Sequence, residues 1–416
     1  MKLLVVGLAS LPNLKVAANG FALPDQDAFA TARGEAVVAT ADNPSAIYYN
    51  PAGITQLEGN NLRVGVYLLD YHTTFKPPES APNAGETYDE QDNLAAIPRF
   101  FYTFSGTNSP WSFGLGVYSP FGGKMSWPQN TGFRAVAISG QLTYITINPV
   151  VARKILPSLS VAAGLTVNYV DLQTDQGLRP TASPYKNYFR FKGSGWSSGA
   201  NAGIFWRPLD QLTFGVMARS PSTVTLSGNT EFEQQPFIPN ASRTAKMDLT
   251  FPFSLVSGVS WRPTAKWNLE FDANYTDWSS FGKTTMHQSN PPFPLRENVP
   301  VTLDWQASWM YEFGITRYFD SGWHVSGGYC LNKNSVPNSY YTPLAADMDR
   351  QFFSAGFGWT GEHWSFDLAY QFGYGPEHAV TGSKPSSTPG QIAGQTADGK
   401  YNFYSNAVSV SLGLHF

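Results

Sequence analysis

Residues 267–276 read Trp-Asn-Leu-Glu-Phe-Asp-Ala-Asn-Tyr-Thr, and apolar or aromatic residues alternate with polar ones along the whole stretch. Successive side chains of a β-strand point to opposite faces of a sheet, so this alternation predicts a strand with one apolar and one polar face. The same pattern runs through residues 303–313, 364–373 and 407–416. Several of these segments are about 10–15 residues long, with aromatic residues near the ends of the apolar face. Those features are typical of strands in a transmembrane barrel, with its lipid-facing bands and aromatic girdles.

The composition supports a membrane barrel. Of the 416 residues only 14% are charged, whereas soluble domains carry about a quarter, and 15% are aromatic. The mean hydropathy is −0.23, and the sequence holds no apolar run of about 18 residues that would predict a spanning helix. The net charge of −3 favours no nucleic-acid partner, and the single Cys330 excludes an internal disulfide.

From residue 59 onward the sequence predicts about 14 strands joined by connections that alternate between short and long. The predicted strands are 60–71, 94–106, 111–120, 136–154, 158–172, 194–207, 211–228, 244–262, 266–279, 301–317, 322–332, 350–360, 363–374 and 402–416. The long connections are 72–93, 121–134, 173–193, 229–243, 280–300, 333–349 and 375–401. Bacterial outer-membrane barrels keep short turns in the periplasm and long loops outside. We therefore expect an outer-membrane protein whose amino and carboxyl termini are both periplasmic.

The amino-terminal residues 1–18 are predicted to be a secretory signal. Lys2 precedes an apolar core, and Val16 and Ala18 are suitably placed for cleavage after Ala18. A buried strand is the alternative interpretation of this segment. Residues 19–58 follow, and the barrel is expected to span residues 59–416.

Residues 42–53, Asp-Asn-Pro-Ser-Ala-Ile-Tyr-Tyr-Asn-Pro-Ala-Gly, fit neither a strand nor a long helix. Pro44 and Pro51 each lack a backbone donor, and Gly53 weakens strand pairing. The apolar residues between the prolines nevertheless favour burial. We therefore predict that residues 19–58 form a compact plug, here called the hatch, inside the barrel lumen.

Several short motifs carry a family resemblance. They are Asn19-Gly20-Phe21, Asn50-Pro51-Ala52, Arg219-Ser220, Leu226-Ser227-Gly228, Trp267-Asn268-Leu269-Glu270, Tyr275 to Phe281, Gly327-Gly328-Tyr329, Asp347-Met348-Asp349-Arg350 and Ser354-Ala355-Gly356. In these residues the chain resembles the FadL family of outer-membrane transporters for long-chain fatty acids and aromatic hydrocarbons. Phe251-Pro252-Phe253 departs from the family's usual leucine-proline.

The resemblance implies a monomeric barrel of 14 strands closed by an amino-terminal hatch and surrounded by outer-membrane lipid. A hydrophobic small molecule or fatty acid is captured among the outer loops, passes to a site beside the hatch and leaves sideways through the wall. No cofactor and no nucleic acid is implied. The alternatives are a general diffusion porin, a structural or adhesin barrel, and an outer-membrane lipase or protease.

Candidate ligand-binding residues lie in two places. Gly20, Phe21 and Leu23 follow the predicted cleavage site. Phe121, Trp127 and Phe133 belong to the connection 121–134, which we expect to expose an apolar cluster that captures ligand. Packing against neighbouring loops is the alternative for this cluster.

Three consecutive hatch residues, Asn50, Pro51 and Ala52, are expected to hold the far end of the hatch and to take part in gating. Pro51 limits the backbone, and the Asn50 side chain can bond nearby main chain. The alternative is a static plug in which Phe21 only fills space.

The sequence yields no catalytic or metal-ligating candidates. The G-x-S-x-G stretch 195–199 continues as a predicted strand, whereas a nucleophile elbow requires a following helix. By alternation, eight charged barrel residues should face the lumen and pair with one another and with the hatch; alternatively, one arginine meets a carboxylate head of the ligand. The barrel residues are Arg63, Arg99, Arg219, Glu270, Asp272, Asp304, Glu312 and Asp367, and the hatch residues are Asp25, Asp27, Glu35 and Asp42.

Overall fold

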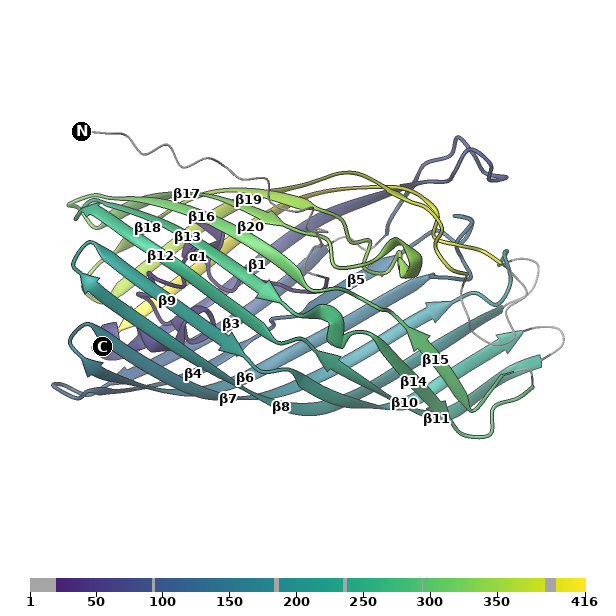
Figure 1. Ribbon diagram of the computed structural model, residues 1–416, viewed down its shortest axis with the longest axis horizontal. Coiled ribbons are helices and arrows are strands. Elements are labelled where there is room, and N and C mark those ends of the chain that lie inside the picture. Colours follow the sequence, from purple (N-terminus) through teal and green to yellow (C-terminus); the bar gives the residue numbers. More distant parts are fainter. Residues whose placement is uncertain (1–19, 92–93, 183–186, 235–237, 294, 386–393) are drawn as a thin grey trace, which may run out of the picture.

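The computed structural model describes residues 20–91, 94–182, 187–234, 238–293, 295–385 and 394–416. The predicted signal segment 1–18 and Asn19 lie outside these ranges. Twenty strand segments form one antiparallel sheet, which closes where the first segment pairs with the last. The result is a closed barrel of 14 strands with a plug, as the sequence predicted (Figure 1).

The segments have the following bounds. The helical segments are α1 (Ala28–Ala32), α2 (Ala46–Tyr49), η1 (Pro51–Gln56), η2 (Trp278–Ser280) and η3 (Asn338–Tyr340). The strands are β1 (Gly59–Lys76), β2 (Tyr88–Asp89), β3 (Leu94–Ser105), β4 (Trp111–Tyr118), β5 (Gly122–Ser126), β6 (Ser139–Leu156), β7 (Leu159–Gln176), β8 (Asn187–Leu209), β9 (Leu212–Arg219), β10 (Ser222–Gln234), β11 (Ile238–Phe251), β12 (Ser254–Thr264), β13 (Trp267–Thr276), β14 (Lys283–Gln288), β15 (Asn298–Thr302), β16 (Ser308–Tyr318), β17 (Trp323–Asn332), β18 (Arg350–Thr360), β19 (Trp364–Val380) and β20 (Gly399–His415).

Five barrel strands are interrupted and so consist of two segments each: β4 with β5, β9 with β10, β11 with β12, β13 with β14, and β15 with β16. Short turns join the strands at the end where the carboxyl terminus lies, and the longer connections lie at the other end (Figure 1). Much of the predicted connection 229–243 is strand. The interrupted strands β9 with β10 and β11 with β12 are each much longer than the roughly 9–11 residues that cross a bilayer.

The wall alternates as predicted. Along β20 the side chains of Ser409 and Ser411 are buried, 0% and 1% exposed, whereas Val408 and Leu412 face outward, 40% and 53% exposed. The outer surface is therefore an apolar band and the lumen is polar. Within the described part of the chain, no helix is both long and apolar enough to cross a membrane.

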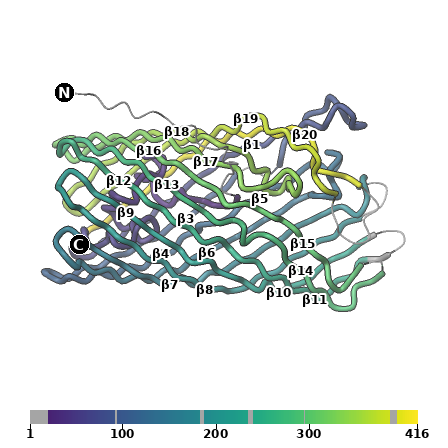
Figure 2. Tube along the Cα trace, in the orientation of Figure 1, coloured from purple at the N-terminus to yellow at the C-terminus, as the bar shows by residue number. Residues whose placement is uncertain are grey.

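The hatch fills the lumen near the short-turn end, where α1 and its neighbours lie inside the ribbon of the wall (Figures 1 and 2). Helices of four to six residues are not stable alone in water, so they depend on burial. Ile47 of α2 supplies that burial, packing in one apolar cluster with Phe101 and Tyr118 of the wall. The Asp27 carboxylate accepts from Phe29 N at 3.1 Å and caps α1.

Buried ion pairs join the hatch to the wall. Arg63 of β1 donates to Asp27 at 2.5 and 2.8 Å and to Asp367 of β19 at 2.6 Å. In the same way Arg33 of the hatch meets Glu270 of β13 at 3.2 Å. The predicted pairing of lumen charges with one another and with the hatch is confirmed for Arg63 with Asp367 and Asp27. Glu270 faces the lumen as predicted, but its partner Arg33 was not among the predicted hatch charges.

One predicted strand is partly wrong. Residues 303–307 separate β15 from β16 instead of continuing the alternation. Asp304 has a left-handed backbone, φ 51°, and an exposed side chain, so it does not face the lumen as expected. The break turns Trp305 inward, where it is buried.

Candidate functional site

A cavity of about 570 Å³, here called the main cavity, lies in the lumen above the hatch. Its floor includes Pro24, Asp25 and Glu35 of the hatch, and Leu344 and Ala345 from the connection after β17 help to close the opposite side. Most of its lining is apolar or aromatic, with polar side chains such as Gln141, Asn332 and Gln371 between them. This volume and lining are typical of a site for a small lipophilic ligand.

The amino-terminal segment Gly20–Pro24 lies against this cavity. The Phe21 ring is 5.1 Å from the Trp305 ring and 6.4 Å from the Phe281 ring, measured between centroids. Gly20 has φ 54°, and a Cβ at this position would come within 2.6 Å of the Trp305 ring, so only glycine fits there. Gly20, Phe21 and Leu23, all predicted ligand-binding residues, are therefore brought together beside the cavity.

Phe121 also lines the cavity, at the break between β4 and β5. Its ring packs at 5.1 Å from Phe251, 5.2 Å from Tyr144 and 5.7 Å from Trp278. Trp278, Phe281 and Trp305 were not among the site residues predicted from the sequence. The available signal was Asp277, which caps η2 through a bond from Ser279 N and so interrupts the predicted strand.

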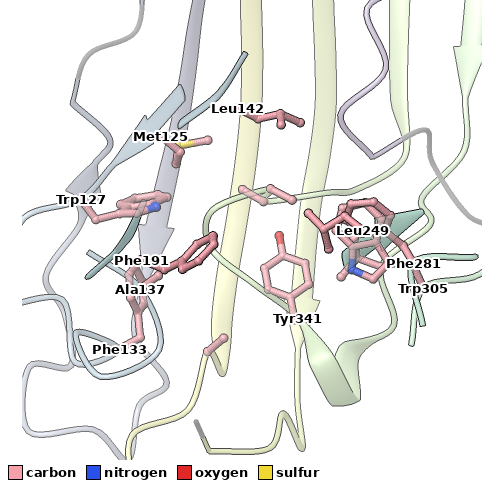
Figure 3. Packing of buried hydrophobic residues seen from close by; sticks show 14 of the residues in the cluster. Met125, Trp127, Phe133, Ala137, Leu142, Phe191, Leu249, Phe281, Trp305 and Tyr341 are labelled. Carbon is pink, nitrogen blue, oxygen red and sulfur yellow. The ribbon is translucent and has the colours of Figure 1, made fainter. Parts of the chain in front are cut away.

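Trp127 and Phe133 do not line the main cavity. They are 1% and 0% exposed, so the expected exposed apolar cluster is wrong for both. Their rings pack 5.4 Å from each other, and each also packs against Phe75 of β1. Figure 3 shows the two side chains on the opposite side of the apolar cluster from Phe281 and Trp305. Other strand extensions and connections cover them, as the alternative interpretation held.

Asn50, Pro51 and Ala52 lie in the hatch at the start of η1. The Asn50 amide donates to the carbonyl oxygens of Val38 at 2.8 Å and of Ile204 in β8 at 2.9 Å, and its oxygen accepts from Ala52 N at 3.2 Å. Gly203 of β8 allows this approach, since a Cβ there would come within 2.3 Å of the Asn50 oxygen. One amide therefore links two parts of the hatch to the wall.

The wall is incompletely paired beside the cavity. β3 pairs with β4 only from Phe100 to Ser105, and β5 pairs instead with β6. The described residues 94–99 of β3 do not pair with β5. Beyond this gap, Gln91 pairs with Ser126, and the Gln91 N donates to the Ser126 O at 2.7 Å. We call this gap the wall window. The lining of the main cavity includes exposed residues on both rims: Leu94, Ala96 and Pro98 on one, and Gly123 and Lys124 on the other.

The amino-terminal segment bonds to the backbone at the strand break that forms the window. Leu23 N donates to Pro120 O at 2.9 Å, and Gly122 N donates to Phe21 O at 3.0 Å. Between β4 and β5 the chain therefore bonds to the hatch rather than to β3. Any displacement of the segment would remove these bonds and change the rim of the window.

Four charged residues line the cavity: Asp25, Glu35, Lys124 and Arg350. Arg350 of β18 lines it, and the buried Asp347 carboxylate accepts from Ser335 N and Oγ, both at 2.9 Å, and from Gly20 N at 3.4 Å. Burial raises the pKa of Asp347 above its usual range, and Arg350 offsets part of that increase. The G-x-S-x-G stretch lies within β8, as expected, with no helix after it. The arrangement is suited to binding a lipophilic molecule.

Comparisons with known proteins agree with this geometry. A long-chain fatty acid transport protein of Escherichia coli O6:H1 is 20% identical over 388 residues, 82% of this chain and 84% of that protein. An outer membrane protein of Neisseria meningitidis serogroup B is 24% identical over 403 residues, 85% of this chain and 86% of its own.

Solved structures share the fold. A FadL homologue of Pseudomonas aeruginosa superposes with a TM-score of 0.81 at 19% identity, covering 96% of this chain and 100% of that one. The Ralstonia pickettii toluene transporter TbuX gives a TM-score of 0.68 at 12% identity, covering 94% and 98%. The family described as outer membrane protein transport protein (OMPP1/FadL/TodX) matches residues 10–416. The chain therefore belongs to this family of outer-membrane transport proteins.

Proposed function

We propose that this protein carries long-chain fatty acids or similar lipophilic or aromatic molecules across the outer membrane as a monomer. The observation that carries the proposal is the main cavity, whose lining continues from the aromatic site at Phe21 to the exposed rims of the wall window. A lipophilic molecule gains from apolar surroundings along this route, whereas a water-filled pore would offer it none. The fatty acid transport activity of the Escherichia coli relative and the toluene transport of the Ralstonia structure support this class of cargo.

The exit is sideways. The hatch closes the direct path towards the short-turn end, with its charged residues paired to the wall. The window lies at the level of the cavity and has apolar Leu94, Ala96 and Pro98 on its β3 rim. A cargo leaving there passes from an apolar cavity to the lipid without crossing water.

The amino-terminal segment is the gate in this proposal. Its Phe21 ring occupies the aromatic end of the cavity, beside Trp305. A ligand that binds there more tightly when the segment is displaced shifts the population towards the displaced state. Because the segment also bonds Pro120 and Gly122, the same displacement alters the window. In this scheme Phe121 contacts the ligand. Trp127 and Phe133 do not line the cavity, and their packing supports the loops at the end of the barrel where the ligand is captured.

Blocking the window tests the route. Gly123 is exposed on the rim, so a Gly123→Cys variant can be labelled with a bulky maleimide, while the buried Cys330 is protected. We expect the labelled protein to lose most uptake of a radiolabelled long-chain fatty acid in reconstituted vesicles. The matched control is Val151→Cys, an outward-facing position on β6, where the label should leave uptake unchanged.

Equal uptake by both labelled variants would remove the lateral exit from the mechanism. A large, steady ion conductance of the unmodified protein in planar bilayers would instead identify a general diffusion porin. Retention of the cargo in the barrel with the window blocked would place the block after the cavity, as the proposal requires.

A further inference from the structure

The end of the main cavity that meets the hatch is acidic. Asp25 and Glu35 of the hatch both line the cavity, and they are 8% and 3% exposed. Their carboxyls are hydrogen-bonded to each other. Two adjacent buried carboxyls do not both ionise readily, so the two groups share a proton and together carry one negative charge. We call these two residues the carboxyl pair.

Neutral donors hold the carboxyl pair in place. The Tyr49 hydroxyl donates to Glu35 Oε2 at 2.7 Å, and the Gln371 amide donates to Asp25 Oδ1 at 2.9 Å. The other oxygen of Glu35, Oε1, is buried and accepts no hydrogen bond from the described residues. Within those same residues neither carboxyl forms an ion pair inside 4.0 Å. A buried negative charge without a cation is costly, and a cation in the cavity would offset that cost.

The basic side chains around the cavity are engaged elsewhere. Arg99 donates to the main-chain carbonyl of Asp25 and does not line the main cavity, so it acts on the carboxyl pair from outside that space. Arg350 does line the cavity, but the buried Asp347 beside it supplies the opposite charge. Lys124 is exposed on the rim of the wall window. On its cavity side the carboxyl pair therefore meets no cation among the described residues.

Two further buried carboxyls of the lumen are placed differently. Asp272 accepts from Val37 N and Val38 N, both at 2.8 Å, and the Glu312 side chain is hydrogen-bonded to Asn274. Both carboxyls border a crevice of about 20 Å³, and neither lines the main cavity. The carboxyl pair is therefore the part of the buried negative charge that a molecule in the main cavity would meet.

The wall adds an acceptor to the same end of the cavity. Asn332, at the end of β17, lines the cavity and is 8% exposed, and its buried Oδ1 has no hydrogen-bond partner among the described residues. Cys330 lies two positions earlier on the same face of β17 and interacts electrostatically with Glu35 and Asp25. This interaction places the end of β17 beside the carboxyl pair. An unpartnered amide oxygen of the wall and an unpartnered carboxyl oxygen of the hatch therefore border one space.

We propose that the acidic end of the main cavity is a subsite for the ammonium head of long-chain primary amines, whose alkyl chain lies along the apolar lining. This inference rests on the proposed transport of lipophilic molecules and adds a cationic class of cargo to it. A primary ammonium has three N–H donors, and the side-chain oxygens of Glu35, Asp25 and Asn332 are acceptors of the kind that it requires. Because the donor is charged, these hydrogen bonds are stronger than bonds from a neutral donor.

The same geometry ranks other head groups below a primary amine. An alcohol has one donor and no charge, so it gains a neutral hydrogen bond only. A quaternary ammonium has the charge but no N–H, so it leaves the carboxyl oxygens without a donor. An ionised carboxylate would meet a like charge at the carboxyl pair, so a long-chain acid would place its head elsewhere in the cavity.

Ligands that differ only in the head group test this assignment on the unmodified protein. The full chain in micelles of a non-ionic detergent is titrated at neutral pH with dodecylamine, dodecanol and dodecyltrimethylammonium, and the three dissociation constants are measured. An alkylamine is protonated at this pH. We expect the amine to bind about tenfold more tightly than the alcohol, the effect of one strong charge-assisted interaction. The quaternary ammonium should bind about as weakly as the alcohol.

Isosteric substitutions then remove the charge. Glu35→Gln and Asp25→Asn each keep an acceptor for the neutral donor that holds the carboxyl in place. Each should lower the ratio of amine affinity to alcohol affinity about threefold, and the double variant should bring the ratio to about one. The matched control is Asp42→Asn, since Asp42 is also a hatch carboxylate but pairs with Arg262 and does not line the main cavity. It should retain the full preference for the amine.

Each outcome decides the assignment. An unmodified protein that binds amine and alcohol equally overturns the ammonium subsite but leaves lipophilic transport standing. Equal affinity for the primary and the quaternary ammonium overturns the hydrogen-bonded site, and so does a preference for the amine that survives in the double variant. If none of the three ligands binds the unmodified protein, the proposed function itself fails.

Discussion

The body of the hatch, residues 25–56, and its amino-terminal segment, residues 20–24, are held by different forces. The body is fixed by buried charges, with Arg63 bonded to both Asp27 and Asp367 and Arg33 bonded to Glu270. The segment has no ion pair in its described residues and relies on a few backbone bonds and ring contacts, such as Phe21 on Trp305. Buried ion pairs are costly to break once formed, whereas apolar contacts can be exchanged for contacts with a lipophilic ligand. From this comparison we expect the segment to be displaced more readily than the body.

The largest effect is expected when the ion pairs that hold the hatch body most strongly are removed. Arg63→Met removes the arginine that the buried carboxylates of Asp27 and Asp367 share, and breaking such a buried pair costs about 3–5 kcal/mol. Asp367 keeps its contact with the His324 ring. We expect a lower melting temperature of the hatch and a raised ion conductance in planar bilayers. The control is Arg262→Met, because the Arg262–Asp42 pair is more than a third exposed on one side and contributes only about 0.2–1 kcal/mol. Equal conductance in the two variants would show that the charges do not hold the body.

A smaller effect is expected at Asn50. Asn50→Ala removes the donor for the Val38 and Ile204 carbonyls and the acceptor for Ala52 N, and an unsatisfied buried group costs about 1–3 kcal/mol. Hydrogen exchange measured by mass spectrometry should accelerate in η1 and around Val38. Asn50→Asp keeps the bond from Ala52 N but loses both donations, so its exchange should also accelerate. A hatch with unchanged exchange in both variants would contradict the role given to this amide.

Sequence patterns predicted the barrel well because alternation is a local property of each strand. Ser409 inside and Leu412 outside follow from it directly. The site depends on what interrupts the strands. Trp305 turns inward because Asp304 adopts a left-handed backbone. The alternation of apolar and polar residues in 303–307 does not by itself distinguish this break from a continuing strand.

The second failure concerns long-range packing. Phe133 was expected to be exposed, yet its ring lies 4.7 Å from Phe75, which is more than fifty positions away in the chain. Apolar residues in a connection become buried or exposed according to which distant segments reach them. The wall window could not be predicted from the sequence for the same reason, because it depends on which strands pair with β3 and with β5.

A substitution in the amino-terminal segment should change the melting temperature less, and ligand binding more, than the substitutions in the hatch body. Phe21 is half-buried, so Phe21→Ala removes about 1–1.5 kcal/mol of apolar burial. We expect roughly tenfold weaker retention of a long-chain ligand after purification, measured by native mass spectrometry, with an unchanged melting temperature of the barrel. Phe21→Leu, which keeps an apolar side chain, should restore most of the retention. A variant that also conducts ions would place Phe21 in the closure of the lumen instead.

The smallest expected effect concerns the pH dependence of the hatch body near the floor of the cavity. Burial, with a contribution from Asp25, raises the pKa of Glu35 well above its usual range. A carboxyl whose pKa is raised on folding stabilises the folded state at low pH, and that contribution is lost as pH rises through the folded-state pKa. The hatch should therefore loosen gradually as pH rises above the usual range of a glutamic acid, seen as faster hydrogen exchange after correction for the intrinsic rate.

Glu35→Gln separates this group from its neighbours. Glutamine keeps an acceptor for the Tyr49 hydroxyl, which donates to the Glu35 carboxylate at 2.7 Å, but it cannot ionise. The groups that remain around this position are Asp25, whose pKa burial also raises, and the side chains of Arg99 and Glu312. If Glu35 is responsible, the variant shows a flatter exchange profile with pH, and the melting temperature at low pH stays close to that of the unmodified protein. A slope as steep as before would assign the dependence to Asp25, because that carboxyl shares the same buried environment and would be the group left to ionise.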